Sequence, residues 1–337
     1  MLMNLTQLNN AFTLFLSLLV EAMPFLLLGV LFSSVLLFFV EEELLIRWLP
    51  KNPFLGALAG SCVGFLFPVC ECGNVPVARR LLSQGVPTPV AIGFLLAAPT
   101  INPIVFWATW TAFRDQPEVV FLRIGTSLAI ATIIGWVFSA QTDLRELLQP
   151  NVAKSMPAPA KEASNSLLQP GTYWLGESGM RMDIADLQMA SAASASIAKK
   201  PLSIKLQLLV ENMIQEFREL GAVLVLGSAI AAIIQVFTPR EVILSLGQGP
   251  VTSILAMMLL AAVVSICSTV DSFFALSFAS TFTTGSLLAF LVFGPMIDLK
   301  GVGLMLSIFK PRAIFYLFVL AAQLTFIVSL LVNLYLS

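Results

Sequence analysis

The chain has 337 residues, and none of them is histidine. This absence excludes Ser–His–Asp triads, zinc or haem sites with histidine ligands, and proton relays through imidazole. Charged residues are also scarce, at 11% of the chain, whereas a soluble domain carries about 25%. The formal net charge of −1 offers no attraction to nucleic acid. We therefore expect no enzyme activity, no resident cofactor or metal and no nucleic-acid partner.

Hydrophobic residues make up 58% of the chain and gather in long runs. The main runs are 11–40, 87–113, 119–140, 221–237, 251–266, 286–293 and 313–336. A helix that crosses the hydrocarbon core needs roughly 20 mostly apolar residues. The runs do not alternate in polarity as barrel strands do, and helices satisfy their own backbone groups in lipid. The pattern predicts an all-α polytopic protein of the lipid bilayer.

The first apolar run, 11–40, is expected to remain in the protein as a span. No Lys or Arg precedes Glu21, whereas a secretory signal peptide begins with positive charge. A different composition marks residues 141–205, which are polar, rich in proline and carry several basic residues. We interpret this segment as a solvent-exposed, largely flexible linker on the cytoplasmic side. It divides the chain into a first half, 1–140, and a second half, 206–337.

The two halves resemble copies of one another. Six pairs of residues match in order at offsets of 196 to 198 positions: Glu21 and Glu219, Gly29 and Gly227, Cys70 and Cys267, Asn74 and Asp271, Pro99 and Pro295, Asn102 and Asp298. The series includes rare cysteines and polar residues inside apolar sequence, so chance similarity between hydrophobic segments is a poor explanation. The sequence therefore predicts an internal repeat.

Each half is predicted to contain four spans and one irregular connecting segment. The predicted segments are 11–40, 53–70, 71–86, 87–112 and 118–140, then 211–237, 250–267, 268–285, 286–308 and 311–336. Within the connecting segments, 75–84 and 272–282 are predicted to be short helices that enter the membrane without crossing it. The total is about eight spans, or up to ten membrane segments. Four spans per half would make the copies parallel and five would make them inverted, and the sequence leaves both open.

The motif Pro-Val-Cys-Glu-Cys-Gly-Asn-Val-Pro at 68–76 ends an apolar run. Proline frees backbone carbonyls, and such a break is tolerated inside a membrane only where it packs in protein or lines a cavity. Cys70, Cys72 and Asn74 are therefore candidates for a solute site, together with Cys267 and Asp271 in the second copy. The alternative is that these are small packing residues and interhelical hydrogen-bond donors. All four cysteines, including Cys62, are expected to be reduced and buried.

A second paired motif places a proline three residues before a polar side chain. Pro99 precedes Asn102, and Pro295 precedes Asp298. An aspartate at the centre of a membrane helix costs about 2.5–3.5 kcal/mol on insertion scales, so Asp271 and Asp298 are candidates to bind substrate or exchange a proton. The alternative is that Asp298 lies near a helix end and reaches the interface beside Lys300. These assignments place the titratable side of the site in the second half.

Simpler roles are expected for the remaining polar and aromatic residues. Glu219 is interpreted as interfacial and Glu21 as the more buried of the pair. Arg79 and Arg80 are interpreted as determinants of orientation. Four tryptophans are interpreted as parts of interface belts: Trp48, Trp107, Trp110 and Trp136.

These motifs, with Gln-Gly-Val-Pro at 84–87 and Cys-Ser-Thr-Val-Asp-Ser-Phe at 267–273, resemble a family of predicted bacterial permeases. That family includes the organoarsenical efflux permeases, the ArsP-like group. The resemblance covers both halves and leaves out the linker. It implies a multi-pass permease of the bacterial inner membrane with about eight spans. The arsenic-exporting members handle trivalent, thiol-seeking compounds, which soft cysteine ligands suit.

The sequence favours a secondary-type permease whose small-molecule or ion substrate binds between the halves near the bilayer midplane. The candidate binding residues are Cys70, Cys72, Asn74, Pro99, Asn102, Cys267, Asp271 and Asp298. No phosphate-binding loop of the G-x-x-x-x-G-K-[ST] type occurs, so energy would come from an ion gradient or a partner ATPase. The alternatives are a passive channel, a membrane scaffold and, least favoured, an intramembrane aspartyl protease. A homo-oligomer is compatible with all of them.

Overall fold

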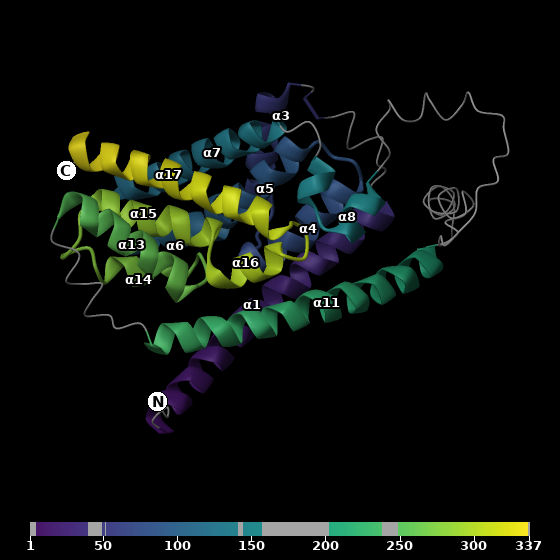
Figure 1. The fold of residues 1–337 in the computed structure, drawn as a ribbon, viewed down its shortest axis with the longest axis horizontal. Coiled ribbons are helices and arrows are strands. Elements are labelled where there is room, and N and C mark those ends of the chain that lie inside the picture. The colour runs from purple at the N-terminus through teal and green to yellow at the C-terminus, as the bar shows by residue number, and fades with distance from the viewer. Residues whose placement is uncertain are drawn as a thin grey trace, which may run out of the picture.

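The computed structural model describes residues 5–39, 49–50, 52–140, 144–156, 202–237 and 249–335. In these ranges the regular secondary structure is helical apart from one isolated bridge (Figure 1). The first half contains α1 (Leu5–Phe39), α3 (Pro53–Val63), η1 (Gly64–Leu66), α4 (Glu71–Ser83), α5 (Thr88–Ile101), α6 (Pro103–Ala112) and α7 (Pro117–Ser139). Next come η2 (Leu144–Leu147) and α8 (Pro150–Ser155). The second half contains α11 (Leu202–Phe237), α13 (Pro250–Val264), α14 (Asp271–Leu276), α15 (Thr284–Met296), α16 (Leu299–Met305) and α17 (Pro311–Tyr335).

Six helical segments among the described residues are long and apolar enough to cross a membrane. They are Gln7–Phe39, Thr88–Ala112, Pro117–Ser139, Ile204–Val236, Thr284–Met305 and Pro311–Tyr335. Two shorter apolar helices, Pro53–Leu66 and Pro250–Val264, lie at the predicted second span of each half. The all-α, multi-pass membrane class is thereby confirmed. The count of eight spans depends on the two shorter helices and stays a prediction.

The helices form a bundle with a similar packing pattern at two places. In the first half α3, α5 and α7 pack against one another, and in the second half α13, α15 and α17 do the same. These groups meet where α5 and α7 contact α15 and where α7 contacts α17. Along one side of the bundle α1 packs on α11 and α4, whereas α11 packs on α16 (Figure 1). The internal repeat itself stays a prediction.

The two connecting segments contain short helices, as the sequence predicted, but with different bounds. Helix α4 begins at Glu71, earlier than the predicted residue 75, and Pro76 lies inside it, where it offers no backbone donor for an intrahelical bond. Helix α14 ends at Leu276, earlier than the predicted 282. The Ser277 hydroxyl donates to the Phe274 carbonyl at 2.6 Å, and the chain continues in single turns.

Part of the predicted linker is buried rather than exposed to solvent. Leu148 and Val152 are almost fully buried, and the backbone nitrogen of Gln149 donates to the Ile308 carbonyl at 2.8 Å. The backbone nitrogen of Lys310 donates to the Leu147 carbonyl at 2.8 Å. The interpretation of 141–205 as exposed was therefore wrong for Leu148 and Val152, because these apolar side chains pack on other parts of the chain that composition does not reveal. Residues 157–201 lie outside the described part.

Glycine permits the close crossing of α1 and α4. A Cβ added at Gly29 would lie 2.2 Å from the Gly73 carbonyl oxygen, and one added at Gly73 would lie 2.6 Å from the Phe25 carbonyl oxygen. Both obstacles are backbone atoms, so a larger residue forces the helices apart. The position of Gly73 inside the 68–76 motif thus fixes how closely α4 approaches α1.

Replacing Gly29 with alanine is expected to lower the free energy of unfolding by about 1–3 kcal/mol, the usual cost of overpacking. Unfolding in mixed micelles with a rising fraction of sodium dodecyl sulfate, followed by circular dichroism, measures this change. Gly125→Ala is the matched control, since nothing lies within 4 Å of an added Cβ there and alanine favours helix. Equal stability of the two variants would contradict the close-packing argument.

The outer surface of the bundle carries large apolar side chains. Trp107 and Trp136 are 70% and 52% exposed, and Trp110 is 36% exposed, which is compatible with the predicted contact with lipid interfaces. Trp48 lies outside the described residues. Cys62 is exposed among these apolar groups, so the expectation that all four thiols are buried was wrong for this one.

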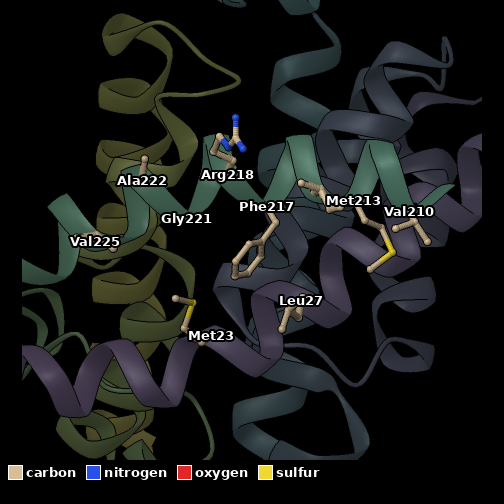
Figure 2. A pocket seen from close by; sticks show the side chains of 10 residues that line it. Met23, Leu27, Val210, Met213, Phe217, Arg218, Gly221, Ala222 and Val225 are labelled. Atoms are coloured by element: carbon tan, nitrogen blue, oxygen red, sulfur yellow. The ribbon is translucent and has the colours of Figure 1, made fainter. Parts of the chain in front are cut away.

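A groove of about 510 Å³ runs along the outside of the bundle between α1 and α11 (Figure 2). Phe217 and Met213 of α11 point toward α1, from which Met23 and Leu27 face them. Ile214 and Leu27 are 57% and 46% exposed, so the groove opens outward. This lining is apolar apart from Arg218, so the groove suits apolar groups better than a polar solute.

Candidate functional site

The buried polar residues gather where α4, α6, α14 and α16 meet inside the bundle. Each of these short helices begins at or next to a motif that the sequence singled out. The charged and amide side chains there that are less than a tenth exposed include Glu71, Asn74, Asn102, Arg123, Asp271, Asp298 and Lys300, and three thiols are equally buried: Cys70, Cys72 and Cys267. We call this region the crossing site.

Asn102 and Asp298 start the second parts of two broken helices. The Asn102 Oδ1 accepts from the Val105 backbone nitrogen at 2.8 Å, and the Asp298 Oδ1 accepts from the Gly301 backbone nitrogen at 2.7 Å. Each side chain is therefore the N-cap of the helix that follows it, α6 after Asn102 and α16 after Asp298. The paired motifs thus have a shared structural role in the described structure: each ends one helix and begins the next, at corresponding sequence positions of the two halves.

The amide of Asn102 also satisfies carbonyls that the break exposes. Its Nδ2 donates to the Ala98 carbonyl at 3.2 Å and to the Val69 carbonyl at 3.1 Å. In a continuous helix the backbone nitrogen of residue 102 would bond to Ala98, so the side chain replaces it. Pro99 is buried in the last turn of α5 and has no backbone donor. These contacts explain how an interrupted helix is tolerated inside the bundle.

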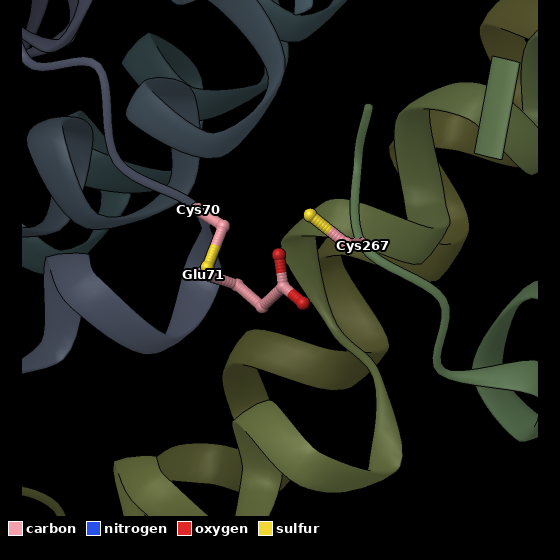
Figure 3. Close-up of side chains that lie close together, drawn as sticks. All are labelled: Cys70, Glu71 and Cys267. Carbon is pink, nitrogen blue, oxygen red and sulfur yellow. The ribbon is translucent and has the colours of Figure 1, made fainter. Parts of the chain in front are cut away.

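Two thiols and a carboxylate from the two halves meet at the centre of the crossing site. Ligand atoms of Cys70, Glu71 and Cys267 all lie within 4.8 Å of one another, and all three residues are buried. Cys70 and Glu71 stand at the start of α4, while Cys267 lies in the segment between α13 and α14 (Figure 3). Figure 3 shows the Cys267 sulfur and the Glu71 carboxylate pointing toward one another from segments of the two halves. The Cys267 sulfur also lies 3.4 Å from the Thr269 hydroxyl.

A buried lysine supplies the opposite charge. The Lys300 Nζ lies 3.6 Å from the Glu71 Oε1, and the side chains are 1% and 7% exposed. Asp298 is two residues away and its Oδ2 has no hydrogen-bond partner, nor has the Glu71 Oε2. The alternative that Asp298 reaches the interface beside Lys300 is wrong, because both side chains are enclosed by protein.

Asp271 is held by a buried arginine of the first half. The Arg123 Nη2 donates to the Asp271 Oδ2 at 2.8 Å, and its Nη1 donates to the hydroxyls of Thr109 and Ser272 at 2.8 Å each. Nη2 also contacts the Ser268 carbonyl at 3.3 Å. The ion pair is 1% and 4% exposed. One guanidinium thus fastens α6 and α7 to the start of α14.

Asn74 and Cys72 complete the set of candidate residues that the sequence indicated. Asn74 is fully buried, and neither its Nδ2 nor its Oδ1 has a hydrogen-bond partner. A buried amide without partners loses its hydration uncompensated, which is unfavourable unless a ligand or water reaches it. Cys72 is 1% exposed and does not belong to the thiol–carboxylate group.

Three charged residues of the crossing site were missed from the sequence as site candidates. Glu71 stood inside the quoted motif without an assigned role, Lys300 was interpreted as lying near the interface, and Arg123 was passed over within its span. The sequence did contain a signal for them, because a charged residue within apolar sequence is costly in a membrane and therefore indicates a functional or paired group. The expectation that titratable groups belong to the second half alone was wrong, since Glu71 and Arg123 come from the first.

A second group of charges lies at the other end of α4. The Arg80 Nη2 is 2.9 Å from the Glu216 Oε1, and the Arg79 Nη1 is 3.3 Å from the Glu219 Oε2. The first pair is largely buried and the second is half exposed, in keeping with an interfacial Glu219. Besides any effect on orientation, the two arginines join α4 to α11.

The fold and the crossing site define a multi-pass helical membrane protein in which broken helices enclose paired charges, as solute transporters do. The chain belongs to a family described as predicted permeases, which matches residues 7–334. The family resemblance carried by the motifs is thereby confirmed, and the chain is a membrane permease by family.

Two relatives match most of the chain. The UPF0718 protein YcgR of Bacillus subtilis is 40% identical over 327 residues, covering 97% of both chains. A putative two-component membrane permease complex subunit of Streptococcus mutans is 33% identical over 301 residues, covering 89% of this chain and 87% of the relative. No solved structure matches the chain.

Proposed function

We propose that the chain is a secondary-type permease of a bacterial inner membrane that moves a small, thiol-seeking solute through the crossing site. The observation that carries this proposal is the meeting of Cys70, Glu71 and Cys267 inside the bundle, with one ligand residue supplied by the second half. Relative movement of the halves would open and close such a site, as alternating access requires. The cytoplasmic position of 141–205 and the division into two repeats belong to the same proposal.

The roles proposed for the candidate residues follow from their contacts. Cys70 and Cys267 are the solute ligands, and Asn74 offers the unsatisfied amide nearby. A larger set shapes and holds the site: Pro99, Asn102 and Asp298 through the helix breaks, and Asp271 through its bond to Arg123. Cys72 is a further thiol on α4 that the solute meets when the halves move.

A passive channel is the competing transport function, and the small cavity at the crossing site disfavours it. The cavity beside Cys70 measures about 10 Å³ and is lined by Ser268, Asn102 and neighbouring side chains. That volume holds about one water molecule, so the described residues beside Cys70 leave no room for a wider aqueous path there. Electrical recording from planar bilayers distinguishes the two, since a channel gives unitary currents that persist without an ion gradient to couple to.

Trivalent methylated arsenic is the first solute to test, because it reacts with paired thiols. We expect everted membrane vesicles that contain the protein to accumulate it, and Cys70→Ser or Cys267→Ser to reduce the initial rate at least about tenfold, since serine binds a soft centre poorly. Cys62→Ser is the matched control, as this thiol lies on the outer surface. Wild-type vesicles without accumulation would end the arsenic assignment and leave the permease family intact.

A partner subunit is also proposed. The streptococcal relative is named a subunit of a two-component membrane permease complex, and no phosphate-binding loop occurs in the present sequence. A second component could couple transport to energy or receive the solute. Affinity purification of the chain from its native membrane in mild detergent, with the masses of co-purifying chains determined, tests this proposal; a lone chain or homo-oligomer contradicts it.

A further inference from the structure

The crossing site contains three potential metal ligands of mixed hardness. Cys70 and Cys267 offer sulfur, and Glu71 between them offers a carboxylate oxygen. Two residues come from the start of α4 and the third from the segment that precedes α14. We propose that this triad binds a divalent cation of the zinc and cadmium class as the transported substrate. The inference rests on the proposed function only in treating the bound cation as cargo.

The distances suit one cation with little rearrangement. The ligand atoms lie within 4.8 Å of one another. In a tetrahedral site with metal–sulfur bonds of about 2.3 Å, neighbouring ligand atoms are about 3.8 Å apart. Closing each pair by about 1 Å or less is within reach of side-chain rotation. No disulfide joins the two thiols, so both sulfurs remain available.

Unused bonding capacity at the triad also favours a ligand. The Glu71 Oε2 is buried, has no hydrogen-bond partner and belongs to a side chain that is only 7% exposed. An ionised carboxylate oxygen without a partner is unfavourable in a low-dielectric interior. A cation would satisfy this oxygen, while Lys300 stays on Oε1 at 3.6 Å.

The donor set selects among cations. Thiolates disfavour Mg²⁺ and Ca²⁺, which take oxygen ligands in sites of six or more. The carboxylate disfavours a cation that prefers sulfur alone, such as Cu(I). Two sulfurs and one oxygen with an open fourth position match a tetrahedral Zn²⁺ or Cd²⁺ site that can exchange its ion. The cavity of about 10 Å³ beside Cys70 gives room for one water molecule at that position.

The charge balance of the site follows from the ligands. When a divalent cation binds, the S–H bonds of Cys70 and Cys267 break, two metal–sulfur bonds form, and two protons pass to water. The net charge of the enclosed region is therefore the same before and after binding. This avoids the desolvation cost of adding an uncompensated charge to the interior.

The test is a cobalt titration of the full chain, purified in detergent under reducing conditions. Co²⁺ bound to thiolates in a tetrahedral site gives sulfur-to-metal absorption in the near ultraviolet and ligand-field bands in the visible. We expect one Co²⁺ per chain, displaced by Zn²⁺. Cys70→Ser and Cys267→Ser should each weaken binding at least about tenfold, and Cys62→Ser should leave it unchanged because that thiol lies elsewhere on the outer surface.

Several outcomes would overturn the inference. One is the absence of the near-ultraviolet band from wild-type protein that elutes as a single species on gel filtration. Another is binding that survives both serine substitutions. If a variant fails to elute as a single species, alkylation of wild-type protein before titration takes its place, and undiminished binding after alkylation of Cys70 and Cys267 also counts against the site. Solute accumulation in vesicles without cobalt binding would contradict the cation site and retain the proposed transport function. Cobalt binding without any transport would retain the cation site and contradict the role of the cation as transported substrate.

Discussion

Replacing Arg123 with methionine is expected to lower the free energy of unfolding by about 3–5 kcal/mol, the usual cost of leaving one partner of a buried ion pair alone. The substitution leaves the buried Asp271 carboxylate, whose side chain is 4% exposed, without its cation. It also removes the donor that the hydroxyls of Thr109 and Ser272 share. Unfolding in mixed micelles with a rising fraction of sodium dodecyl sulfate gives the measurement.

Arg79→Met is the matched control for Arg123→Met. It removes the same chemical group from a pair with Glu219 in which the side chains are 23% and 51% exposed, so we expect a loss of no more than about 1 kcal/mol. The double variant Arg123→Met with Asp271→Asn should recover part of the lost stability, since no bare charge is left inside. Equal losses for Arg123→Met and Arg79→Met would show that the buried network does not hold the halves together.

Lys300→Met is expected to have the second large effect, again about 3–5 kcal/mol of unfolding free energy. It leaves the Glu71 carboxylate buried without a counter-charge, and Asp298, whose Oδ1 accepts from the Gly301 backbone nitrogen, loses the positive charge two residues away. Adding Glu71→Gln should restore much of this stability. The double-mutant cycle is expected to show a coupling of about 1–3 kcal/mol, as for residues in direct contact.

The Lys300 and Glu71 cycle also separates folding from transport. If Glu71 is a ligand, the double variant regains stability in micelles but stays inactive in vesicles and binds Co²⁺ more weakly. A double variant that transports as well as the wild type would remove Glu71 from the solute site. A coupling near zero would instead show that the 3.6 Å contact contributes nothing to stability.

These two ion pairs give a structural role to charged residues that the apolar sequence indicated as binding candidates. Asp271 was selected because a lone aspartate is costly in a membrane helix, and the cost is largely offset by Arg123 from the opposite half. We therefore propose that Asp271 holds α14 in place, and that the residues left for chemistry are those with unsatisfied atoms, such as Glu71 and Asn74.

The sequence could predict a good part of the site because covalent geometry alone dictates it. Proline disfavours a continuous helix, and Asn102 and Asp298 each follow one by three positions, so breaks near 102 and 298 could be predicted without a structure. Pro76 inside α4 shows that a proline does not end every helix. The helix bounds differ from the predicted ones by a few residues: α4 begins at Glu71 and α14 ends at Leu276. The corresponding positions of Cys70 and Cys267 likewise followed from the register of the two halves.

The pairing of charges could not be predicted in the same way. Arg123 and Asp271 are 148 residues apart, and a hydropathy window registers each as an isolated cost without showing a partner. Lys300 gave the appearance of an interfacial residue because it follows the end of an apolar run, yet the structure encloses it beside Glu71. The burial of Leu148 was hidden for the same reason, since its docking surface lies near Ile308.

By itself the sequence determined that this is a helical membrane protein, where its helices break and which thiols lie at the breaks, because solvation by lipid and backbone sterics act on local sequence. Only the tertiary structure decided that Cys70, Glu71 and Cys267 meet, that Asp271 pairs with Arg123 and that Glu71 pairs with Lys300. Those facts depend on which helices cross, and close crossings such as Gly29 on Gly73 are set by packing between segments distant in the chain.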